Sequence, residues 1–149
     1  MKKVFITLAV ILIAIVLCFC HLFIFDYRVF LKNDTERVES YLKAVKVGEE
    51  FDLSQVCTSC DSVFLVEPYD AEFFDRNSHL KLMPFIKRSI LSDTWYDGGY
   101  QMLFVKGNKV VSFAKISGGY PFREYNNQGL KFPVNAKLYF DKERGILLK

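Results

Sequence analysis

A long apolar run near the N-terminus constrains this chain more than any other feature of its sequence. Residues 4–25 read VFITLAVILIAIVLCFCHLFIF, and Thr7 and His21 are the only clearly polar side chains among these 22 residues. As a helix the run would extend about 33 Å, enough to cross a hydrocarbon core of roughly 30 Å. The run therefore predicts a transmembrane helix, with residues 1–25 as an N-terminal membrane anchor in contact with the bilayer through residues 4–25.

Two other interpretations fit the same segment. Lys2 and Lys3 ahead of an apolar run have the order of a cleaved signal peptide, although Cys18-Phe19-Cys20 poorly matches the small residues that cleavage requires. The N-terminus also resembles a bacterial lipoprotein leader, but the small residue expected just before a modified cysteine is missing. An uncleaved signal anchor is the interpretation that these residues favour.

The charges of the chain are nearly balanced once this segment is set apart. Lys2 and Lys3 are the only charged side chains of residues 1–25, so 18 of the 20 basic and all 17 acidic residues lie in residues 26–149. A nearly neutral domain lacks the clustered basic face of a nucleic-acid-binding protein, and no nucleic-acid partner is expected. The two lysines abut the apolar run on a short tail, which predicts a cytoplasmic N-terminus. Residues 26–149 are then expected outside the cytoplasm, in the periplasm or the extracellular space.

The N-terminal half of residues 26–149 predicts helices around one buried strand. Asn33 and Glu36 have the spacing of a capping box, which predicts a helix that Gly48 closes. The β-rich run SVFLV predicts a buried strand over residues 62–66. A short helix over residues 71–76, capped by Asp70, and a helix from Pro84 to Leu91 complete this half.

The C-terminal half predicts antiparallel strands. Residues 100–105 and 110–116 flank Lys106-Gly-Asn-Lys109, the clearest hairpin signal in the chain. Residues 117–129 are rich in Gly, Pro and Asn and predict a loop, and residues 136–141 and 145–148 predict a final hairpin. We therefore expect one α+β domain over residues 26–149, with an antiparallel sheet of about five strands and one to three helices packed on one face.

Two strings in the chain carry a family resemblance. CDSVFLVEPYDAEFF, followed later by LFVKGNKVV, resembles a loose group of small exported or membrane-anchored bacterial proteins of unknown function. The resemblance covers roughly residues 57–116. It implies an N-terminal membrane leader and a small extracytoplasmic domain, and it implies no catalytic residue, cofactor or partner.

Cys57 and Cys60 form the sharpest chemical motif. In an oxidising compartment these thiols can close a small disulfide, worth about 2 kcal/mol on the chain-entropy model. A thiol-disulfide redox factor is the alternative function, but a catalytic CxxC places its first thiol at a helix N-terminus, and here the strand-like DSVFLVE follows. Free or otherwise paired thiols stay open as a further alternative. A zinc site would need four ligands, and only His79 is a candidate helper.

Catalytic signatures are missing from the sequence. His79 is the only histidine of residues 26–149, and there is no G-x-S-x-G, no H-E-x-x-H and no phosphate-binding glycine loop. An acidic cluster could serve glycoside cleavage or bind calcium, but helix capping and the helix dipole explain two of its members. The cluster comprises Glu67, Asp70, Glu72 and Asp75. We therefore expect no catalytic residue, no metal and no cofactor, and a protein that is not an enzyme.

Aromatic residues near Gly98-Gly99 and Gly118-Gly119, in predicted turns, form the candidate interaction surface. They are Trp95, Tyr96, Tyr100, Tyr120, Phe122 and Tyr125. Tyr and Trp are favoured at protein interfaces because they bury much area at low entropy cost. Ordinary packing against the core is the alternative. The sequence thus predicts a membrane-anchored extracytoplasmic binding or accessory module, with an envelope protein as its partner.

Overall fold

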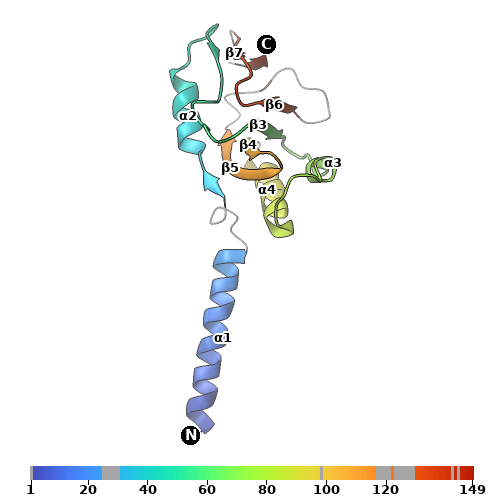
Figure 1. The fold of residues 1–149 in the computed structure, drawn as a ribbon. Coiled ribbons are helices and arrows are strands. Elements are labelled where there is room, and N and C mark those ends of the chain that lie inside the picture. The colour runs from blue at the N-terminus through green and yellow to red at the C-terminus, as the bar shows by residue number, and fades with distance from the viewer. Residues whose placement is uncertain are drawn as a thin grey trace.

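The computed structural model describes residues 2–24, 31–97, 99–116, 122, 130–141, 143 and 145–149 (Figure 1). The fold is α+β, with two sheets and helices on either side of the larger one. The elements in chain order are α1 (Lys2–Ile24), β1 (Lys32–Asn33), α2 (Thr35–Ala44), β2 (Glu50–Phe51), β3 (Ser62–Val66), α3 (Phe73–Arg76), α4 (Pro84–Asp97), β4 (Tyr100–Lys106), β5 (Lys109–Ile116), β6 (Leu130–Pro133), β7 (Leu138–Phe140) and β8 (Ile146–Leu148).

The apolar N-terminal run forms α1. The structure describes the side chains of Ile6–Cys18 in this helix, and all of them are exposed. No helix among the described residues is long and apolar enough to cross a membrane. This finding contradicts the predicted transmembrane helix, the signal anchor and the single-pass membrane location with the C-terminal domain outside the cytoplasm.

The larger sheet contains five strands in the order β1-β5-β4-β3-β6. Neighbouring strands from β5 to β6 run antiparallel, whereas β1 runs parallel to β5. The sheet is therefore mixed, and the expectation of a purely antiparallel sheet was wrong. The parallel pairing arises because the chain enters along the edge of β5 and passes directly into α2, where the Asp34 N–H donates to the Phe113 carbonyl over 2.8 Å.

A second sheet of three strands, in the order β2-β7-β8, was not expected. The predicted C-terminal hairpin is observed as β7 and β8, but it belongs to this sheet together with β2. Two ion pairs tie β2 and the residue after it to residues beside β7 and β8: Lys137 Nζ lies 2.8 Å from Asp52 Oδ2, and Lys149 pairs with Glu50. The strand β2 has two residues, too few to show the alternation by which a strand is recognised.

Every residue of β3 is buried, because both faces of the larger sheet are covered. Val63 and Leu65 belong to a core that also holds Val38 and Leu42 of α2. Phe64 and Val66 belong to a second core, built with the apolar side chains of α3 and α4. A strand without polar alternation is expected where both faces of a sheet are covered. The helices therefore pack on both faces, and the prediction of helices on one face was wrong.

Local capping differs from the predicted pattern at α2. This helix begins at Thr35 with Asp34 as its N-cap residue, whereas Asn33 lies in β1 and its Oδ1 accepts the Thr35 N–H over 3.0 Å. The Asp34 side chain pairs with Lys32 Nζ at 2.7 Å. The helix ends at Ala44, and Gly48 lies beyond it in a turn with φ 80°, a left-handed conformation that favours glycine.

The other two helices of the domain also depart from their predicted ends. The helix α3 begins at Phe73, and Asp70 does not cap it with its side chain, because its carboxylate binds Arg76 Nη2 at 2.5 Å. The helix α4 begins at Pro84 as predicted but continues to Asp97, six residues beyond Leu91. The longer α4 carries Trp95 and Tyr96 on its last turn, so these residues do not lie in a loop.

Candidate binding site

The larger sheet ends in a cavity where elements from both of its faces meet. Tyr100 at the start of β4 pairs with Ile116 at the end of β5, and α4 ends three residues before Tyr100. The cavity has a volume of about 200 Å³. It is lined by Thr35 and Glu39 of α2, Asp93 and Thr94 of α4, and Gly99, Tyr100, Gln101, Lys115 and Ile116 from β4, β5 and the segment before β4.

Hydrogen bonds and an ion pair between Asp93 and Lys115 fix much of the polar part of this lining. Lys115 Nζ lies 2.9 Å from Asp93 Oδ2, and the two side chains are only 28% and 26% exposed. The backbone N–H of Lys115 donates to Thr35 Oγ1 over 2.9 Å, which joins α2 to the edge of β5. The hydroxyl of Thr94 donates to the carbonyl of Leu91 at 2.8 Å, inside α4. The walls are thus held by contacts within the protein.

Glu39 is the third charged group of the cavity and is held differently. Its carboxylate lies 3.6 Å from Lys43 Nζ, one helical turn further along α2. The Lys43 side chain is 65% exposed, whereas that of Glu39 is 30% exposed. Exposed pairs at this spacing contribute only a few tenths of a kcal/mol. Glu39 therefore keeps a carboxylate at the cavity with a weak internal partner.

The size of the cavity suits a single side chain better than a whole metabolite. Sites for drug-sized ligands usually enclose roughly 300–1,000 Å³, more than this cavity offers. Its described lining holds no histidine and no cysteine, and Lys115 pairs with Asp93 at 2.9 Å. The arrangement can bind an amphipathic group, but it does not present an acid and a base to a common reacting atom.

The predicted aromatic surface meets this cavity through Tyr100 alone among the described side chains. Phe122 is 3% exposed and packs in the core, with its ring centroid 6.5 Å from that of Tyr100 and 6.0 Å from that of Phe132. The side chains of Trp95 and Tyr96, and all of Tyr120 and Tyr125, lie outside the described residues, as does most of the predicted loop over residues 117–129.

Sequence reasoning missed the charged members of the lining. Lys115 interrupts the apolar strand β5, and a charge inside such a strand signals a partner from the covering layer. The partner itself, Asp93, lies on α4 and gives no signal of its own in the sequence. Thr35 and Glu39 resemble ordinary surface residues of an amphipathic helix.

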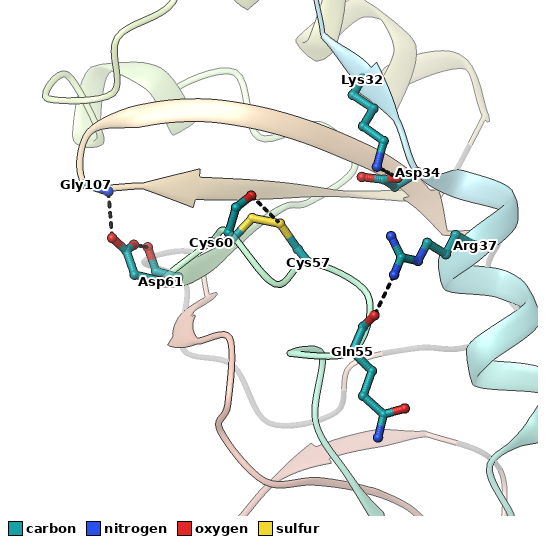
Figure 2. The surroundings of a disulfide bond; sticks show 10 residues. Lys32, Asp34, Arg37, Gln55, Cys57, Cys60, Asp61 and Gly107 are labelled. Carbon is teal, nitrogen blue, oxygen red and sulfur yellow. Dashed lines mark hydrogen bonds and ion pairs between the residues drawn. A yellow bond between two sulfur atoms is a disulfide. The ribbon is translucent and has the colours of Figure 1, made fainter.

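Cys57 and Cys60 lie at disulfide-bonding distance, with Cα atoms 5.6 Å apart (Figure 2). Cys57 is buried and Cys60 half-buried, whereas the linking residues Thr58 and Ser59 are exposed. Cys57 follows a single turn closed by its own N–H on the Leu53 carbonyl, and none of the described helices begins there. The helix dipole that lowers the pKa of a catalytic thiol is therefore not available from these elements.

Neighbouring contacts hold the disulfide loop at both ends (Figure 2). Arg37 of α2 donates from Nη2 to the Gln55 carbonyl over 2.8 Å, just before Cys57. Asp61, just after Cys60, accepts the Gly107 N–H over 2.7 Å. The loop is thus tied to α2 on one side and to the β4–β5 turn on the other.

The acidic cluster is dispersed and largely paired. Arg76 binds Asp70 at 2.5 Å and Glu72 at 3.6 Å, and Asp75 is exposed. Burial and the neighbouring Asp70 raise the pKa of the Glu67 carboxyl, an effect that Arg76 partly offsets. No group of three or more histidine, cysteine or acidic side chains suited to a metal ion occurs within the described part of the chain. His79 is exposed, with its ring 5.9 Å from that of Phe64.

Comparisons of this chain with models of protein families, with characterised proteins and with solved structures found no match.

Proposed function

We propose that the protein is a non-catalytic protein-binding module whose cavity beside Tyr100 receives one side chain of a partner protein. The observation that carries the proposal is a cavity of about 200 Å³ between α2, α4 and the paired ends of β4 and β5. Protein interfaces concentrate their binding energy in a few anchor side chains that fill pockets on the partner, and tyrosine is frequent at such positions. A preformed pocket of one-side-chain size supports this mode of binding.

Selection of peptides tests this proposal. Random peptides displayed on phage are selected against the immobilised full chain, and the affinities of the enriched peptides are then measured for two variants. Tyr100→Ala removes a wall of the cavity, and Tyr139→Ala makes the same change at a half-buried tyrosine of the second sheet. Circular dichroism and thermal unfolding verify that both variants are folded.

We expect Tyr100→Ala to weaken the enriched peptides by at least about tenfold, equivalent to about 1.4 kcal/mol, and Tyr139→Ala to leave them unchanged. Equal affinities for the two variants would show that the enriched peptides do not bind in the cavity. A selection that enriches no binding peptide would overturn the binding module itself.

A thiol-disulfide redox factor is a second candidate, favoured by the placement of the two sulfur atoms and by the exposed Thr58 and Ser59 between them. The buried Cys57 and the absence of a described helix starting there weigh against it. Alkylation followed by mass spectrometry separates the candidates. A fully oxidised pair that resists mild reductant supports a structural bridge, whereas a mixed population or a trapped mixed disulfide supports redox work.

A further inference from the structure

The charges around the cavity indicate which kind of side chain the cavity receives. We infer that the cavity accepts a lysine or arginine side chain of the partner, with Glu39 as the group that receives the positive charge. The inference rests on the proposed function, because it concerns the same cavity.

The sign of the charge follows from the three ionised groups on the lining. Asp93 and Lys115 pair with each other at 2.9 Å, and both are half-buried. Glu39 is left with Lys43 at 3.6 Å, and that lysine lies mostly in solvent. The cavity therefore carries one negative charge in excess over its own lining. An incoming cation can replace Lys43, since an exposed lysine pair is easily exchanged.

The apolar part of the lining suits the stem of such a side chain. Tyr100 and Ile116, paired across β4 and β5, stand on the same rung of the sheet at the cavity. Lysine and arginine bury their methylene groups against apolar surface while the charged end seeks a polar partner. The Tyr100 ring adds a cation–π contribution when the charge passes over its face. One wall thus binds the stem, and the other carries the counter-charge.

Other side chains fit this lining less well. A leucine or phenylalanine in the cavity would cover the Glu39 carboxylate and remove its water without supplying a partner, which is costly. An aspartate or glutamate would meet two carboxylates, and the single ammonium of Lys115 is already paired with Asp93. Electrostatic complementarity therefore selects a cation.

A titration of the isotope-labelled full chain at low salt tests the inference. The probes are blocked pentapeptides Gly-Gly-X-Gly-Gly, in which X is arginine, lysine, leucine or glutamate, and binding is followed by amide chemical shifts. We expect the arginine and lysine peptides to shift the amide signals of Thr35, Glu39 and Lys115, and the leucine and glutamate peptides to leave those signals unchanged.

Three variants make the test specific for Glu39. We expect Glu39→Gln to weaken the arginine peptide by at least about tenfold, in the range reported for charge pairs at interfaces. Glu36→Gln, a matched change at an exposed glutamate of the same helix that does not line the cavity, should have no effect. Lys43→Gln removes the competing lysine and should tighten binding.

The outcomes separate this inference from the proposed function. Equal losses in Glu39→Gln and Glu36→Gln would show non-specific attraction and overturn the inference. If displayed peptides bind at the cavity but carry leucine or acidic anchors, the inference is overturned while the binding module stands. If no displayed peptide binds, the proposed function fails, and the inference fails with it.

Discussion

The carboxylate of Asp61 accepts a hydrogen bond of 2.7 Å from the backbone N–H of Gly107, 46 residues further along the chain. Gly107 opens the two-residue turn between β4 and β5 with φ 60°, the conformation that a hairpin turn of type II′ reserves for glycine. Asp61 also donates its own N–H to the Val105 carbonyl over 2.9 Å. One residue thus joins the end of the disulfide loop to the tip of the central hairpin.

The Asp61 contact predicts a pH-dependent contribution to stability. The Gly107 N–H, and then the Ser62 hydroxyl, hold the pKa of Asp61 below its ordinary value of 3.8. A lowered carboxyl pKa in the folded state stabilises the fold above the ordinary value, and the contribution is lost as the pH falls through the folded pKa. Asp61→Asn should lower the thermal midpoint at pH 7, and the difference from the natural chain should close below pH 3.8. If the difference in thermal midpoint does not change with pH, the ionised Asp61 carboxylate does not make this contribution.

The Glu67 carboxyl predicts a contribution to stability with the opposite pH dependence. Its Oε1 is buried without a hydrogen-bond partner among the described residues, and burial raises its pKa above the ordinary 4.5. The folded state therefore binds more protons than the unfolded state just above pH 4.5, so stability decreases as the pH rises through this window. Glu67→Gln should raise the thermal midpoint at pH 7 and have little effect at pH 4. Destabilisation at pH 7 would show that the charged carboxylate has a favourable partner.

The two-sided burial of the larger sheet predicts large losses from both covering layers. Leu42 of α2 and Ile90 of α4 are fully buried against opposite faces of the sheet. Leu42→Ala and Ile90→Ala should each lower the free energy of unfolding by about 2–5 kcal/mol, measured by urea denaturation. Ser40→Ala, at an exposed position of α2, serves as the control. A small loss for Ile90→Ala would mean that α4 does not cover the sheet.

The disulfide predicts a modest effect on stability. The bridge between Cys57 and Cys60 closes a loop of four residues, for which chain entropy gives about 2 kcal/mol. The double variant Cys57→Ser, Cys60→Ser should therefore lose about this much in urea denaturation under oxidising conditions. Under strong reductant the natural chain should fall to the same stability as the variant. If reductant leaves the natural chain unchanged, the thiols do not form the bridge in solution.

The sequence predicted those parts of the fold that have a local signal. The strand over residues 62–66 is observed as β3, and the Gly107-Asn108 turn joins the two strands that flank it. The strands β1 and β2 escaped prediction because each has two residues and exists only through a partner far along the chain. The same reason explains the mixed sheet, since a parallel edge depends on where the chain passes and not on its local pattern.

Less of the candidate site than of the fold could be predicted from the sequence. Tyr100 was predicted as an interface residue, and the structure places it in the cavity wall. The ion pair of Asp93 with Lys115 joins α4 to β5, so only the tertiary fold brings the two side chains together. Phe122 shares the aromatic character of the predicted surface, but a buried and an exposed phenylalanine are identical in sequence.

The pairing of β2 with β7 affects how the smaller sheet folds during synthesis and how it responds to proteolysis. Long-range contacts join Asp52 to Lys137 and Glu50 to Lys149, across 85 and 99 residues. A growing chain carries β2 without a neighbour until residues 138–140 emerge, and contacts of such high sequence separation slow folding. Conversely, a protease that cut the exposed Lys137 would free the partners of β2 and open the smaller sheet, while all five strands of the larger sheet lie upstream of the cut.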